Sequence, residues 1–138
     1  MSTALATQTY SYPLISFIHA GNWGSFVDIF EPGDAEQWVT TGKNYGKHAY
    51  ALRVKGHSME PKYPQGCVVV VDPRGKAQAG DTVIARIDAE NEATMKVYKK
   101  DALGNRFLKP INPAFPTIDM QKIDVVFCGV VREIAEHS

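Results

Sequence analysis

The sequence predicts one mostly β domain made of short antiparallel strands. Short apolar segments recur at a spacing of roughly 12 to 15 residues, turns rich in Gly, Pro and Asn separate them, and no long amphipathic helix is present. The length of 138 residues is that of a single domain, and 44% hydrophobic residues suffice for a substantial core.

The N-terminal segment is predicted to contribute little to this core. Residues 1–12 are uncharged and rich in Ser, Thr, Ala and Gln, so we expect a flexible linker, with the folded domain spanning residues 13–138. Apolar residues from Pro13 to Ile18 predict a strand that ends in a turn over residues 19–22. A short apolar stretch covers residues 26–32, and Asp34 could cap one helical turn that reaches Trp38.

Six further strands are predicted from patterning. Residues 48–55 alternate between apolar and polar side chains, as in a half-buried strand, whereas four consecutive valines within 67–72 indicate a strand covered on both faces. Turns bounded by Gly, Pro or Asn separate the remaining strands, which we expect over residues 82–88, 93–100, 106–111 and 124–134.

Composition narrows the classes of function. Fifteen Lys and Arg balance fifteen Asp and Glu, so the chain lacks the basic surplus typical of nucleic-acid-binding domains. No apolar window is long enough to cross a membrane, and Cys67 and Cys128 lie in apolar contexts typical of reduced core cysteines. We therefore expect a soluble cytoplasmic protein that binds no membrane. No His or Cys residues have metal-ligand spacing, so neither a metal nor a cofactor is predicted.

The sequence Gly56-His57-Ser58-Met59-Glu60 is the strongest candidate for a reactive centre. It places a serine just after a predicted strand, at a bend that glycine permits, where a hydroxyl can be exposed beside main-chain N–H groups. An ordinary turn serine is the commoner interpretation of such a pentapeptide. An α/β-hydrolase elbow is excluded because Glu60 stands where that motif requires glycine.

A nucleophilic serine needs a base, which either a histidine or a lysine could supply. The histidines at positions 19, 48, 57 and 137 have no spacing that supports a Ser-His-Asp triad. Lys96 lies within the apolar part of the 93–100 strand, on the same face as Thr94. A desolvated lysine has a lowered pKa and can accept a proton from a serine hydroxyl, although a lysine whose amine reaches water is the commoner case.

Together these residues resemble the LexA-like family of self-cleaving serine-lysine peptidases, which includes LexA, UmuD and the C-terminal domains of lambdoid phage CI-type repressors. The resemblance covers roughly residues 13–135, is nearest to the phage repressors, and implies their LexA/signal-peptidase-like β-fold. Four motifs carry it: Gly56-His57-Ser58-Met59, Thr94-Met95-Lys96, the turn at Gly80-Asp81 with the strand that follows, and Ala20-Gly21. The sequence departs from many relatives at Gln65, where they have an acidic residue beside the glycine.

The resemblance implies self-proteolysis between Ala20 and Gly21. Ser58 would attack the Ala20 carbonyl, Lys96 would act as general base, and main-chain N–H groups of His57 and Ser58 would hold the oxyanion. The segment 17–26 would move between docked and undocked states, and a RecA filament would favour cleavage.

The resemblance leaves three functions open. The first is the C-terminal domain of a repressor, which dimerises or forms a higher oligomer and contacts DNA only through a helix-turn-helix domain that this chain lacks. The second is a UmuD-like DNA-polymerase accessory protein activated by self-cleavage. The third is a non-catalytic β interaction domain. The terminal strand, 124–134, is a candidate interface between copies.

Overall fold

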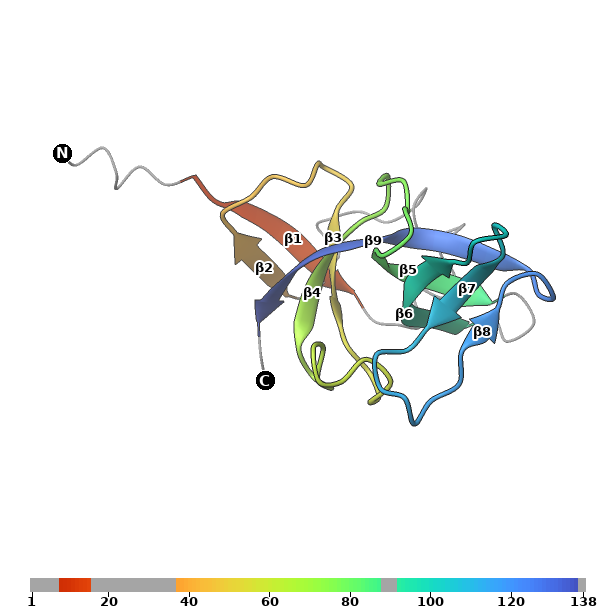
Figure 1. Ribbon diagram of the computed structural model, residues 1–138. Helices are drawn as coiled ribbons and strands as arrows, with labels where there is room; N and C mark the ends of the chain where they lie inside the picture. Colours follow the sequence, from red (N-terminus) through yellow and green to blue (C-terminus); the bar gives the residue numbers. More distant parts are fainter. Residues whose placement is uncertain (1–7, 16–36, 88–91, 137–138) are drawn as a thin grey trace.

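The computed structural model describes residues 8–15, 37–87 and 92–136 (Figure 1). Nine strands form one sheet in the order β2-β1-β3-β4-β9-β5-β6-β7-β8, and the described residues contain no helix that could span a membrane. The strands are β1 (Tyr10–Ile15), β2 (Trp38–Thr41), β3 (Tyr50–Arg53), β4 (Val68–Asp72), β5 (Thr82–Ile87), β6 (Glu92–Lys100), β7 (Arg106–Lys109), β8 (Ile118–Asp119) and β9 (Val125–Glu136).

Strand β9 joins the two halves of the sheet. Figure 1 shows it running across the molecule, with β1 to β4 toward one end and β5 to β8 toward the other. The C-terminal part of β9 pairs with β4, for example Val131 opposite Val71, and its N-terminal part pairs with β5, for example Val125 opposite Ile87. All strand pairs are antiparallel except β1 with β3, which are parallel.

The core explains why the four valines stand in sequence. Every side chain from Val68 to Val71 is fully buried, and successive valines point into different clusters, because side chains alternate between the faces of a strand. Val69 and Val71 belong to the largest cluster, together with both Cys67 and Cys128, which are free thiols. The expected strand covered on both faces and the expected reduced core cysteines are confirmed.

Close packing between β9 and the end of β4 requires a glycine at position 129. A Cβ atom added there would lie 2.4 Å from Val71 Cγ1 and 3.0 Å from the Asp72 carbonyl oxygen. Both β4 and β5 change register along β9, the latter between Ile84 and Ala85. Such β-bulges bend a strand and increase its twist, which allows β9 to serve both halves.

The expected fold class is confirmed, since every regular element described is a strand. The six strands predicted from residue 48 onward are present with shifted ends: β7, for instance, stops at Lys109 because Pro110 has no N–H to donate. Of the other N-terminal expectations, the turn over 19–22, the apolar stretch 26–32 and a cap at Asp34 lie outside the described residues.

Two local expectations were wrong, and one strand was not expected. Strand β1 begins at Tyr10, inside the expected linker, because Tyr12 is buried and its hydroxyl donates a 2.6 Å hydrogen bond to the Lys43 carbonyl. Trp38 begins strand β2, paired with Pro13, instead of ending a helical turn. The two-residue strand β8 was not expected, since it is too short to show any period.

Candidate functional site

The turn that carries Ser58 is fixed at both ends. Val54, just after β3, donates an N–H to the Cys67 carbonyl (2.8 Å), and its own carbonyl accepts the Gly66 N–H (2.9 Å), so the segment between them closes into a loop. Gly56 opens the bend with a φ of 84°, a conformation that side chains with a Cβ rarely adopt. Met59, directly after Ser58, is 1% exposed and anchors the turn in the main core.

Lys96 reaches Ser58 from the other half of the sheet. It lies on β6 opposite the fully buried Val83 of β5, and only 8% of Lys96 is exposed. Its Nζ donates to Ser58 Oγ at 3.2 Å, to Thr94 Oγ1 at 2.6 Å and to the Met95 carbonyl at 3.2 Å. The structure thus brings together the two residues predicted as nucleophile and base, 38 positions apart in sequence.

Thr94 and Asn112 are two polar residues that sequence reasoning did not assign to the site. Thr94 holds the lysine amine through the shortest of the three bonds, and its position on the same strand face as Lys96 was the available signal. Asn112 bonds to the carbonyls of His57 and Ser58 from the loop after β7. No local pattern indicates that contact, because it spans more than 50 residues of sequence.

The other predicted site residues have different outcomes. His57 has a side chain that is 57% exposed, and its Nδ1 lies 2.9 Å from Glu60 Oε2. The hydrogen bond and charge of His57 hold the pKa of the Glu60 carboxyl below its usual value. Ala20 and Gly21, the expected cleavage site, lie outside the described residues, as does the segment 17–26.

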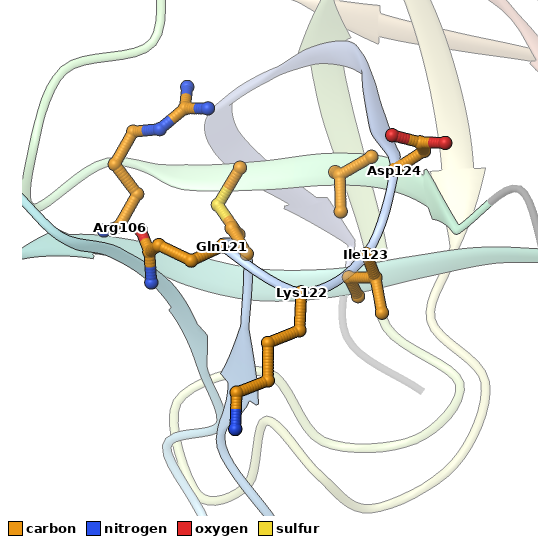
Figure 2. A pocket seen from close by; sticks show the side chains of 7 residues that line it. Arg106, Gln121, Lys122, Ile123 and Asp124 are labelled. Carbon is orange, nitrogen blue, oxygen red and sulfur yellow. Dashed lines mark hydrogen bonds between the residues drawn. The ribbon is translucent and has the colours of Figure 1, made fainter.

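A pocket of about 380 Å³ lies elsewhere, near β7 and the turn between β8 and β9 (Figure 2). In Figure 2 the side chains of Arg106 and Asp124 lie on opposite sides, with Gln121 and Ile123 between them. Neither Ser58 nor Lys96 lines this pocket. The Ser58–Lys96 pair, in which a hydroxyl and an amine are in hydrogen-bond contact, is the stronger candidate for a reactive centre.

The combination of scaffold and site defines a class. A serine hydroxyl within hydrogen-bond distance of a buried lysine amine, on an all-strand scaffold, has the geometry required for a nucleophile and its general base. The family described as Peptidase S24-like matches residues 13–132, and the chain belongs to this family. The resemblance to LexA-like proteins is confirmed.

The curated relatives are regulators of transcription. An HTH-type transcriptional regulator for conjugative element R391 from Providencia rettgeri is 40% identical over 127 residues, which cover 88% of this chain and 58% of that protein. Repressor protein C2 of Salmonella phage P22 is 38% identical over 114 residues (80% and 52%), and the LexA repressor of Syntrophobacter fumaroxidans is 33% identical over 141 residues (97% and 64%). The chain spans a little more than half the length of the first two.

Proposed function

We propose that this chain is the C-terminal domain of a LexA/CI-type repressor and that it cleaves itself between Ala20 and Gly21. In this proposal Ser58 is the nucleophile and Lys96 is the general base. The observation that carries the proposal is the 3.2 Å contact between Lys96 Nζ and Ser58 Oγ, made by a lysine that is almost completely buried. Membership of a peptidase family supports the type of chemistry.

The proposed reaction has two steps. Ser58 Oγ attacks the carbonyl carbon of Ala20 while Lys96 Nζ accepts the hydroxyl proton. The tetrahedral intermediate collapses, the C–N bond to Gly21 breaks, and the leaving amine takes the proton from Lys96. A water molecule then attacks the ester carbonyl while Lys96 Nζ accepts its proton; the C–O bond to Ser58 breaks, Lys96 returns the proton to Ser58 Oγ, and Ala20 is left as a carboxylic acid that ionises.

The surroundings of Lys96 support its role as a base. Burial disfavours the charged form of an amine, and only the neutral amine can accept a proton. Thr94 Oγ1 and the Met95 carbonyl hold Nζ at a fixed point beside Ser58. A flexible lysine would instead have to lose side-chain entropy each time it reached the hydroxyl.

Besides a base, the proposed reaction requires main-chain donors near Ser58 that can form an oxyanion site. Within the described residues, the Ser58 N–H donates to no main-chain or side-chain acceptor. An N–H that has no protein acceptor can donate a hydrogen bond to the substrate oxygen on which negative charge develops. His57 and Ser58 are the residues whose N–H groups we propose for this function.

The relatives favour a repressor over the two alternatives. The three relatives described above are named as transcriptional regulators or repressors, and none of the three is named as a polymerase accessory protein. As part of the proposal, the domain associates with further copies of itself, a RecA filament accelerates the cleavage, and DNA binding belongs to a helix-turn-helix domain outside this sequence. Peptidase-family membership favours catalysis over a purely structural interaction domain.

The test follows the mass of the chain during incubation at pH 7 to 10. Cleavage after residue 20 leaves a product of 138 − 20 = 118 residues. We expect its first-order rate to rise with pH, because a larger fraction of Lys96 is then neutral, and to be independent of protein concentration. At neutral pH, a RecA filament on single-stranded DNA should increase the rate.

Two substitutions identify the chemistry. Ser58→Ala and Lys96→Ala should each abolish the product, whereas Ser11→Ala and Lys99→Ala, at exposed positions, should leave the rate unchanged. Circular dichroism at each pH checks that the variants remain folded. A folded wild-type chain that yields no 118-residue product at pH 10 contradicts the proposed self-cleavage.

A further inference from the structure

We infer that Asn112 is a positioning residue for the reaction, because it holds the turn around Ser58 in the conformation that brings the Ser58 hydroxyl to Lys96. This inference rests on the proposed function, since it assigns Asn112 a part in self-cleavage. Asn112 lies in the loop after β7, between Pro110 and Pro113, and touches neither Lys96 nor the Ser58 hydroxyl through any hydrogen bond within the described residues.

All four hydrogen-bonding groups of Asn112 are engaged. Its N–H donates to the Ser58 carbonyl (2.9 Å), and its Nδ2 donates to the His57 carbonyl (3.1 Å). On the loop side, its Oδ1 accepts the Ala114 N–H (3.0 Å) and its carbonyl accepts the Phe115 N–H (3.1 Å). The residue therefore connects a self-closed loop turn to the nucleophile turn through two bonds of its own.

These bonds fix the two peptide units on either side of Ser58. The His57 carbonyl and the Ser58 N–H belong to one planar trans unit and point in opposite directions. Holding the carbonyl toward Asn112 therefore turns the Ser58 N–H away from it. The Ser58 carbonyl is held in the same manner, so the φ and ψ angles of Ser58, and with them the direction of its side chain, have little freedom.

The loop also connects the two halves of the site. Asn112 follows Lys109 by three residues, and Lys109 pairs with Val97, the neighbour of Lys96 on β6. Through this connection, Asn112 links the turn that carries the nucleophile to the strand pair that carries the base. The 3.2 Å separation of Lys96 Nζ and Ser58 Oγ therefore depends on the bonds of Asn112 as well as on the sheet.

The experiment compares Asn112→Asp with wild type in the alkaline self-cleavage assay. Aspartate keeps an oxygen for the Ala114 N–H, but it replaces the Nδ2 donor with a second oxygen that faces the His57 carbonyl. A displacement of about 1 Å near reacting groups can slow a reaction by about 10²-fold, so we expect a plateau rate lower by about that factor. The pH midpoint should not fall, because the Thr94 and Met95 contacts of the Lys96 amine are kept and a new carboxylate nearby favours the charged amine.

Asn105→Asp is the matched control. Asn105 also donates from Nδ2 in a loop, to Asp101 Oδ2 at 3.0 Å, but it lies in the β6–β7 turn, away from Ser58. We expect its rate to stay within about twofold of wild type, whatever happens to its thermal stability. An Asn112→Asp rate within twofold of wild type, or an equal loss in Asn105→Asp, overturns the positioning role.

Amide hydrogen exchange provides a readout that does not require cleavage. In the wild type, the Asn112 and Glu60 N–H groups, which bond to the Ser58 and His57 carbonyls, should both be protected. Exchange as fast as in an exposed loop overturns the inference even if Asn112→Asp fails to fold. If the wild type neither cleaves itself nor reacts at Ser58 with a fluorophosphonate, the proposed function fails. In that case, faster exchange of the Glu60 N–H in a folded Asn112→Asp variant would still show that Asn112 holds the turn around Ser58.

Discussion

Thr94→Val tests whether a hydrogen bond to the lysine amine contributes to the reaction. Valine keeps the β-branched shape on β6 but removes Oγ1, the acceptor 2.6 Å from Lys96 Nζ. The longer contacts to Ser58 Oγ and to the Met95 carbonyl, both at 3.2 Å, are kept. Hydrogen bonds to charged groups contribute about 1.5–3 kcal/mol, which corresponds to a rate lower by about 10- to 150-fold if the bond is needed in the transition state.

The pH profile gives the same substitution a second signature. An oxygen acceptor stabilises an ammonium more than a neutral amine, so its loss should move the pH midpoint of self-cleavage to a lower value. The assay is the first-order appearance of the 118-residue product, 138 − 20, measured by intact mass at pH 7 to 10.5.

Thr82→Val is the matched control for this prediction. Thr82 is a buried threonine on the adjacent strand β5, opposite Val97 instead of Lys96. Its substitution should leave both the plateau rate and the midpoint unchanged. A Thr94→Val variant that cleaves as fast as wild type with the same midpoint, or a Thr82→Val variant that is slowed equally, would refute the reasoning.

Three further predictions concern the fold. Burial raises the pKa of Cys67 and raises that of Cys128 to about 12, so neither thiol should react with Ellman's reagent at pH 8 until denaturant is added; reaction in the folded state would contradict this. Burial also raises the pKa of Tyr45 to about 12, from 10.0, with a further contribution from a neighbouring carboxylate. Because the folded state holds the protons of Cys128 and Tyr45 more tightly, this stabilisation is complete below about pH 9 and is lost toward pH 12, so the urea midpoint should fall over that interval. Gly129→Ala forces a Cβ to within 2.4 Å of Val71 and should lower the free energy of unfolding by about 1–3 kcal/mol in urea titrations.

Gly42→Ala serves as the control for the last of these predictions. Apart from its two chain neighbours, no residue has an atom within 4 Å of a Cβ added at Gly42, so the change should alter the free energy of unfolding by less than about 0.5 kcal/mol. Equal effects of Gly42→Ala and Gly129→Ala would mean that close packing against β4 is not the cause.

The sequence predicts the strands of this fold better than their order. The four valines of β4 are apolar enough to identify a doubly covered strand, and polar segments that contain Gly or Asn separate the sequences of β5, β6 and β7. Nothing local shows that β9 lies between β4 and β5, because the paired residues are at least 125 − 87 = 38 positions apart in sequence. Strand β2 was missed for a similar reason, since Trp38 finds its partner in Pro13.

The candidate site likewise contains residues that the sequence predicts and residues that it does not. Ser58 and Lys96 follow from short motifs and from a family resemblance, and the structure brings these two residues within 3.2 Å. Strand periodicity places Thr94 on the same face as Lys96, but it does not by itself predict the hydrogen bond between them. Asn112 was not accessible, because its role depends on where a proline-flanked loop lies relative to a turn formed much earlier in the chain.

The position of β9 makes the Ser58–Lys96 contact a property of the complete sheet. Ser58 follows β3 on one side of this strand, and Lys96 lies on β6 on the other, so no strand pairing joins the two halves until residues 125–136 are in place. Ser58 and Lys96 precede β9 in the chain, so a ribosome synthesises them first. Under the proposed self-cleavage, a nascent chain without β9 therefore carries the nucleophile and the base without the strand pairing that brings them together.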